Sequence, residues 1–164
     1  MRRFVIFASF VAAVLVGTIA GAPGLGTVAQ EGTPAAMAGH PVVGAWTGDN
    51  DINDPESPPA VLIFHDDGTF VQANADGSVG FGTWEATGPT TAALTALFHN
   101  VDETGAFAGT LKINVAVEVG EAGDALTAEF TAYFIGPDGT SSDAGTGMAA
   151  AERIAVEPRG TPTP

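Results

Sequence analysis

Asp-Gly dipeptides placed between short alternating runs constrain this chain more than any other sequence feature. Asp67-Gly68 and Asp76-Gly77 separate three runs of strand-forming residues. Such dipeptides favour the tight primed turns of β-hairpins, because these turns need positive φ angles and Gly adopts them without steric cost. We therefore predict antiparallel strands over residues 60–65, 69–73 and 79–86, joined by two hairpins.

The rest of the chain repeats this hairpin unit. Residues 107–119 give the clearest pattern, because Leu111, Ile113 and Val115 alternate with polar neighbours such as Lys112 and Asn114. That period of two residues indicates a strand with one buried and one solvated face. The remaining predicted strands cover residues 42–47, 91–99, 125–135 and 145–156.

Eight strands in sequential hairpins, with no convincing helix, predict an all-β fold. An eight-stranded antiparallel up-and-down β-barrel is the simplest arrangement, because closure removes the exposed strand edges of a flat sheet. A two-sheet sandwich is the alternative, and the long acidic loop over residues 48–59 would then hold its crossover.

The first 29 residues predict an export signal. Arg2-Arg3 is followed by an apolar run over residues 4–20, and Thr27-Val28-Ala29 supplies the small residues of a cleavage site before Gln30. An uncleaved membrane anchor is the alternative, since the run approaches the roughly 20 residues that span a bilayer. We expect a signal peptide at 1–29, a flexible tether at 30–40, the barrel at 41–156 and a disordered Pro-rich tail at 157–164. The expected location is outside the cytoplasm, secreted or in the cell envelope, with no membrane insertion after cleavage.

Charge and cysteine content narrow the possible partners. Residues 30–164 keep all 19 acidic residues but only three basic ones, Lys112, Arg153 and Arg159, which gives a formal charge of −16. Nucleic acid is therefore an unsuitable partner, whereas cations and basic molecules are electrostatically favoured. The chain has no cysteine, which excludes disulfides, thiol catalysis and cysteine-based zinc sites.

The first and last predicted strands carry a family resemblance. Gly44-Ala45-Trp46, preceded by Val42-Val43, matches a G-x-W motif, and Arg153 stands on the last strand. With the order of eight strands, these residues resemble the lipocalin and calycin superfamily, and in particular its small exported bacterial members. The resemblance implies structural roles for Gly44, Trp46 and Arg153, with Trp46 filling the barrel base and Arg153 packing across its ring. It also implies a lipophilic ligand inside the barrel.

Candidate ligand-binding residues follow from the expected barrel. Small-ligand sites of such barrels lie inside the barrel or at its open rim. The candidate lining residues are aromatic: Phe64, Phe70, Phe81, Phe98, Phe130 and Phe134. Their alternative role is to fill the core, because an eight-stranded barrel is only just wide enough to be packed solid.

Two further groups of residues are weaker candidates for chemistry. His65 and His99 each end a strand before an acidic turn, so they could face one another across a rim as metal or haem ligands, although solvated strand-end histidines are the favoured interpretation. The acidic loop offers the oxygen donors Asp49, Asp51, Asn53 and Asp54, which is the ligand type that calcium prefers. It lacks the Gly and the flanking helices of an EF-hand, and a solvated acidic loop is the favoured interpretation.

The sequence therefore predicts a binder of a small apolar or amphipathic ligand, with no catalysis and no cofactor. One alternative is a calycin-type isomerase or cyclase using His65 with Glu85 or Glu129. Another is a solid barrel whose acidic surface meets a basic partner in the cell envelope. A pocket with a buried carboxylate of raised pKa favours the enzyme, an apolar pocket favours the binder, and a solid barrel favours the interaction module.

Overall fold

The computed structural model describes residues 37–54 and 56–157. The predictions of a signal peptide, of the tether over residues 30–36 and of the tail over 158–164 lie outside these residues. Eight strands are present: β1 (Gly44–Asp49), β2 (Pro59–Phe64), β3 (Thr69–Asn74), β4 (Val79–Ala86), β5 (Thr91–Val101), β6 (Phe107–Val119), β7 (Ala125–Ile135) and β8 (Ser141–Arg153).

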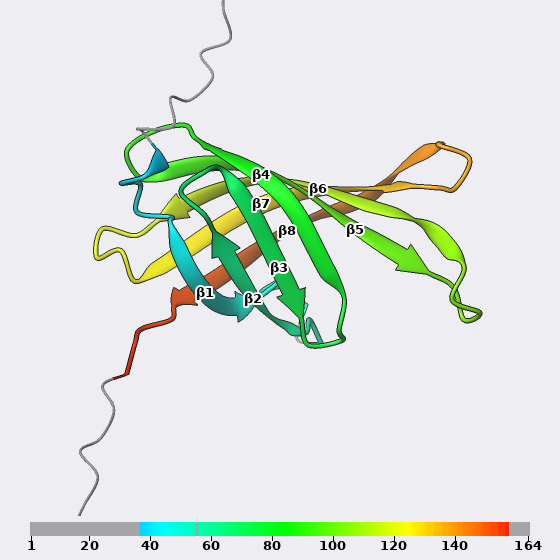
Figure 1. Cartoon of the computed structure of the whole chain (residues 1–164), viewed down its shortest axis with the longest axis horizontal. Helices are drawn as coiled ribbons and strands as arrows, with labels where there is room; N and C mark the ends of the chain where they lie inside the picture. Colours follow the sequence, from blue (N-terminus) through cyan, green and yellow to red (C-terminus); the bar gives the residue numbers. More distant parts are fainter. Residues whose placement is uncertain (1–36, 55, 158–164) are drawn as a thin grey trace, which may run out of the picture.

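The strands form one closed antiparallel barrel in sequence order (Figure 1). Each strand pairs with the next, and β1 closes the barrel by pairing with β8, where Trp46 lies opposite Arg153. The predicted all-β, up-and-down barrel is confirmed, and the closure rules out the two-sheet sandwich. Within the described residues no helix is long and apolar enough to cross a bilayer.

Two details of the hairpins differ from the sequence prediction. The last strand begins at Ser141 and ends at Arg153, about four residues earlier than predicted at its start and three at its end. Small polar residues carry little strand signal of their own, but Ser141 pairs with Ile135 of the long strand β7. The backbone partner therefore decides the strand assignment there.

The turns are also not of the primed type. In the β2–β3 turn the N–H of Gly68 donates to His65 O, and the N–H of His65 donates to Thr69 O. Only glycines have positive φ in the described residues, so Asp67 does not adopt the conformation of a primed turn. This pattern is the three-residue loop with Gly in a bulge, and the β3–β4 turn repeats it.

Unequal strand lengths open the barrel at one end. Strands β1–β4 have six to eight residues, whereas β5–β8 have 11 to 13. Because β8 pairs with β1 only from Ala150 to Arg153, the first part of β8 and the β5–β6 hairpin project beyond the short strands (Figure 1). We call the end with these projecting hairpins the open end, and the opposite end the closed end.

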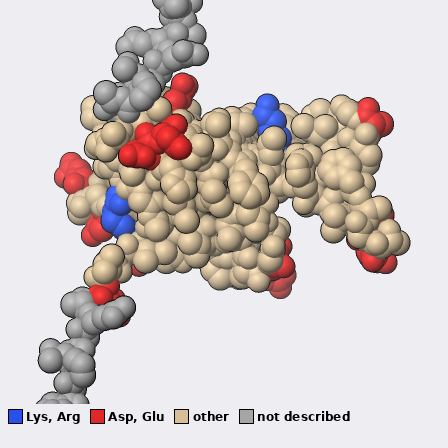
Figure 2. Space-filling view, in the orientation of Figure 1, with Lys and Arg blue, Asp and Glu red and all other residues tan. Residues whose placement is uncertain are grey.

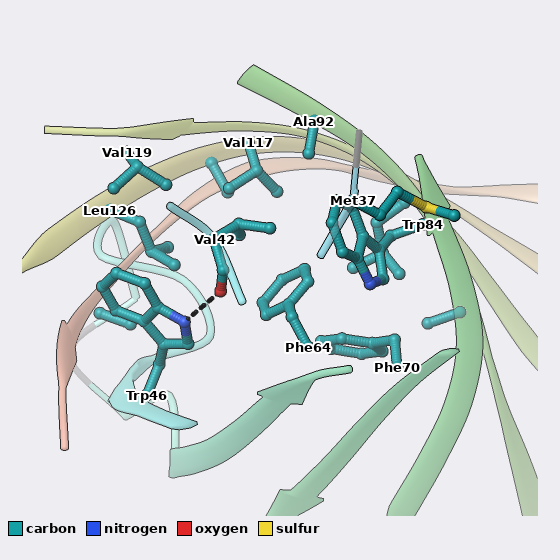
Figure 3. Close-up of a cluster of buried hydrophobic side chains, with 14 of the residues drawn as sticks. Met37, Val42, Trp46, Phe64, Phe70, Trp84, Ala92, Val117, Val119 and Leu126 are labelled. Atoms are coloured by element: carbon teal, nitrogen blue, oxygen red, sulfur yellow. Dashed lines mark hydrogen bonds between the residues drawn. The ribbon is translucent and has the colours of Figure 1, made fainter. Parts of the chain in front are cut away.

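The aromatic core lies at the closed end. Trp46, Phe64, Phe70 and Val42 are the largest fully buried side chains, and they pack with aliphatic residues of β6 and β7 (Figure 3). Trp46 Nε1 donates to Val42 O at 2.8 Å, which satisfies the only polar atom of its ring. The closed end is thus filled solidly by large side chains.

A short N-terminal segment, residues 37–43, covers this end. The N–H of His40 donates to Met37 O, and the N–H of Val43 donates to His40 O, so two successive turns fold the segment back. Met37 and His40 are both buried. The prediction that residues up to 40 form a flexible tether is therefore wrong for residues 37–40, because they pack against the core.

Candidate functional site

The barrel encloses a cavity of about 440 Å³ between the closed-end core and the open end. Ligand pockets in proteins typically measure about 300–1,000 Å³. The walls are mainly aliphatic and aromatic side chains that point inward from the strands: Leu62, Phe64, Leu94, Phe98, Leu111, Ile113, Val115, Val117, Leu126 and Phe130. The barrel is therefore hollow rather than packed solid.

Alanines on two adjacent strands explain part of this hollowness. Ala128 and Ala132 of β7, and Ala149 and Ala151 of β8, all line the cavity. Ala128 lies opposite Ala149 in the strand register, so two small side chains meet on this wall. Because neither side chain reaches the barrel axis, this wall leaves space that the opposite wall does not fill.

Glycines that pair with two of the phenylalanines explain the remaining space in the cavity. Phe98 pairs with Gly80, and Phe130 pairs with Gly147. A Cβ atom on either glycine would lie 2.4 Å from the ring of its partner. The rings therefore lie along the wall, over the glycine backbone, instead of crossing the barrel. Sequence reasoning missed these glycines, although both occupy inward positions in the strand alternation.

The six predicted lining residues divide into three groups. Phe64, Phe98 and Phe130 line the cavity. Phe70 is buried in the closed-end core, and Phe134 lies over Gly109 in the projecting part of the sheet, so neither is among the cavity-lining residues. Phe81 is a wrong prediction, since its side chain is 64% exposed on the outer face.

The outward direction of Phe81 follows from register. Strand side chains alternate between faces, and Gly80 and Gly82 take the inward positions of β4 beside it. Phe81 lies between Val71 of β3 and Leu97 of β5, which form an apolar row on the outer face. Figure 2 shows that the surface over β2 and β3 is free of charged residues, while acidic residues gather at the turns.

The three residues with expected structural roles meet at the closed end. The guanidinium carbon of Arg153 lies 4.1 Å from the centroid of the Trp46 ring. Arg153 donates hydrogen bonds to three backbone carbonyls, those of Gly123, Val43 and Pro41. Gly44 has a φ of 136°, and a Cβ there would lie 2.6 Å from Arg153 Nη1. Gly44 thus makes room for the guanidinium.

The second Gly-x-Trp sequence also contributes to the closed end. Trp84 is buried, donates from Nε1 to His65 O at 2.8 Å, and packs edge-on against Phe64. His40 packs against Trp84 with ring centroids 5.6 Å apart. Since the N–H of Val42 donates to Nδ1 of His40, the proton of its ring lies on Nε2 and is donated to Gly88 O. Both ring nitrogens of His40 therefore have hydrogen-bond partners within the core.

The mouth of the cavity, at the open end, is polar and acidic. Three aspartates line it: Asp49 at the end of β1, Asp51 in the following loop and Asp76 in the β3–β4 turn. The amide side chains of Asn50, Gln72, Asn74 and Asn100 and the hydroxyl of Ser78 line it as well. The cavity therefore changes from apolar at its base to acidic at its opening.

A hydrogen-bond network holds the mouth residues in place. Gln72 Nε2 donates to Asn50 Oδ1 and to Asn74 Oδ1, both at 2.8 Å. Asn74 Nδ2 donates to Ser78 Oγ, which in turn donates to Asp76 Oδ1 at 2.7 Å. The Ser78 hydroxyl, followed by the Ser78 backbone N–H, lowers the pKa of the Asp76 carboxyl below its ordinary value of 3.8. Asp76 is thus ionised at neutral pH.

The candidate histidines do not come together. His65 is exposed beside the β2–β3 turn, at the closed end. His99 is exposed on β5 near the open end, with Nδ1 3.0 Å from Thr110 Oγ1 and its ring edge-on to Phe107. The prediction that they face one another across a rim is wrong, because three hairpin reversals separate β2 from β5, so the two strands run in opposite directions and end at opposite ends of the barrel.

The candidate catalytic carboxylates also lie away from the cavity. Glu85 and Glu129 are exposed, and both line a groove of about 1080 Å³ on the outer face of β4–β8. The four described carboxylates whose pKa clearly departs from the ordinary value, Asp67, Asp76, Asp102 and Asp138, are all lowered by hydrogen bonds at turns. This pattern gives the isomerase or cyclase alternative no support from the cavity.

The acidic loop turns its oxygens toward its own backbone. Asp51 Oδ1 accepts from the N–H and the side-chain amide of Asn53, and Asp54 Oδ1 accepts from the N–H of Glu56. Over residues 37–54 and 56–157, no three acidic or histidine side chains gather in a way that would hold a metal ion. The loop also attaches to the barrel, because the N–H of Ile52 donates to Met148 O.

Comparison with known proteins adds no further assignment. The chain matches no known protein-family model and none of the curated proteins with which it was compared.

Proposed function

We propose that this protein is an exported, lipocalin-like barrel that binds a small apolar or amphipathic ligand in its interior cavity, without catalysing a reaction. The cavity of about 440 Å³ carries this proposal, because its walls are apolar and its volume lies in the range of small-molecule sites. The Trp46–Arg153 contact at the closed end supports the lipocalin-like assignment.

The position of the polar groups also favours binding over catalysis. A binding barrel needs an apolar interior with polar groups confined to its mouth, which fix the orientation of the ligand. The described side chains that line the inner walls follow that division, and the charged ones are found at the opening. A catalytic barrel would need an acid or base beside the reacting atoms inside the cavity.

Native mass spectrometry tests this proposal directly. The protein is purified gently from the secreted or envelope fraction of the organism that produces it. We expect a reproducible extra mass that is released by denaturation, and we expect the emptied protein to bind a neutral apolar fluorescent dye. A bare polypeptide that also fails to bind the dye would refute the proposal.

A matched pair of variants locates the bound dye. Ala149→Phe places a ring inside the cavity, whereas Ala116→Phe places the same ring on the outer face of β6. We expect the first variant to lose dye binding and the second to retain it. Dye binding retained by Ala149→Phe would place the dye outside the barrel, and its loss in Ala116→Phe would place it in the outer groove that Ala116 lines.

A further inference from the structure

The cavity has a direction, because its two ends differ in charge as well as in shape. The base is closed by the aromatic core around Trp46, so a ligand enters and leaves through the open end. Asp49, Asp51 and Asp76 line that end, and none of the described cavity-lining residues is Lys, Arg or His. A ligand with its apolar part in the barrel therefore places its other end among carboxylates.

The mouth also has few free hydrogen-bond donors. Asn50 Nδ2 donates to Pro58 O and Asn74 Oδ1, and both acceptors of Gln72 Nε2 are likewise protein oxygens. The Ser78 hydroxyl is used by Asp76. The donor protons of these side chains are therefore already used in hydrogen bonds within the protein. The carboxylates retain further acceptor capacity, because an ionised carboxylate offers about four lone-pair sites.

The charge of the whole molecule acts in the same direction. With five basic residues against 19 acidic ones, the chain has a formal charge of −14 at pH 7. Its field attracts cations toward the mouth and repels anions. An ionised carboxylate on a ligand would be repelled by this field and by the mouth aspartates, and none of the described cavity-lining residues is a basic residue that could pair with it.

We propose that the ligand is a cationic amphiphile, an alkyl or aryl amine whose apolar body occupies the cavity and whose ammonium group pairs with an aspartate of the mouth, which Asp49, Asp51 and Asp76 line. This inference rests on the proposed function, because it specifies the ligand class of the same cavity. An ammonium group supplies donors only, which matches a mouth that offers chiefly acceptors.

Three probes with the same apolar chain separate this inference from the proposed function. Octylamine, 1-octanol and octanoate are titrated against the dye-loaded protein at pH 7, at low and at high salt. We expect octylamine to displace the dye at a concentration about fivefold lower than octanol, as one partly exposed ion pair would give. Octanoate should be the weakest probe, and added salt should reduce the difference between the three.

The outcomes of this titration distinguish a failure of the proposed binding function from a failure of the cationic ligand class. If none of the three probes displaces the dye and the dye itself binds poorly, the proposed binding function fails. If octanol and octanoate bind as tightly as octylamine, the cavity binds ligands but the cationic class is wrong. A preference for octanoate would overturn the inference directly.

Matched aspartate variants then test the site. Asp76→Asn keeps the Oδ1 acceptor for Ser78 but removes the charge at the mouth, and Asp51→Asn removes a second mouth charge. Asp67→Asn is the control, because Asp67 has the same hydrogen bonds to Thr69 in the equivalent turn at the closed end. We expect each mouth variant to lower octylamine affinity about two- to fivefold while leaving octanol affinity unchanged. An equal effect of Asp67→Asn would show that only the overall charge matters, and would refute the mouth site.

Discussion

Replacing Ala149 by Leu tests whether the barrel interior is hollow, because the sign of the stability change differs between a hollow and a packed barrel. Ala149 lines the cavity on β8 and lies opposite Ala128. Leu adds three carbon atoms, and each buried CH₂ group contributes about 0.8 kcal/mol. Fixing the Leu rotamer costs about 0.5–1 kcal/mol. We therefore expect the free energy of unfolding to rise by about 1–2 kcal/mol.

The assay is urea unfolding followed by tryptophan fluorescence, since both Trp46 and Trp84 are buried in the core. The control is Ala116→Leu, the same substitution at an exposed position of β6, which should change the free energy of unfolding by less than about 0.5 kcal/mol. The slope of the transition should stay the same in both variants, because the surface exposed on unfolding hardly changes.

The refuting result is a loss of stability. In a solidly packed interior the added carbons would force side chains off their rotamers, at a cost of about 1–3 kcal/mol. Destabilisation of Ala149→Leu by more than about 1 kcal/mol would therefore show that the cavity does not exist in solution. The stabilised variant should also bind the apolar dye more weakly, because the new side chain occupies ligand volume.

Three other predictions concern the closed end, the turns and the cavity wall. Arg153→Met should lower the free energy of unfolding, measured in urea, by about 3–5 kcal/mol, because three carbonyls lose a charged donor. The control, Lys112→Met, should change it by less than about 0.5 kcal/mol. Equal effects of the two substitutions would contradict a special role for Arg153. The pKa values of Asp67, Asp76, Asp102 and Asp138 are lowered from 3.8, so the folded state binds fewer protons in the window just below that value. Stability should therefore fall as the pH drops through this window. Replacing the four aspartates by Asn should flatten the dependence of Tm on pH. An unchanged slope of Tm against pH would contradict this prediction. Gly147→Val should push the Phe130 ring into the cavity and weaken dye binding at least about tenfold, whereas full binding would show that the ring moves elsewhere.

The sequence by itself determined the number, order and direction of the strands. Asp-Gly turns and alternating runs are local signals, and hairpins are local structures, so seven of the eight predicted strands lie within a few residues of the observed ones. The position of Trp46 was also readable, because the G-x-W motif marks it, and the role of Arg153 followed from the family resemblance. The type of turn was not, since it depends on backbone angles that the Asp-Gly pair does not fix alone.

Tertiary structure decided which face each residue occupies and whether the barrel is hollow. Phe81 and Phe98 look alike in the sequence, but the pairing of Phe98 with Gly80 places one ring inside and leaves the other outside. A one-residue shift of register exchanges the two faces of a strand, and the register of a hairpin depends on its turn type, which the Asp-Gly pair does not fix alone. The cavity likewise depends on the strand pairing that sets Gly80 beside Phe98 and Gly147 beside Phe130. The acidic mouth depends on β1 and the β3–β4 turn reaching the same end, which is a consequence of closure, because only the closed sheet brings those segments to one opening.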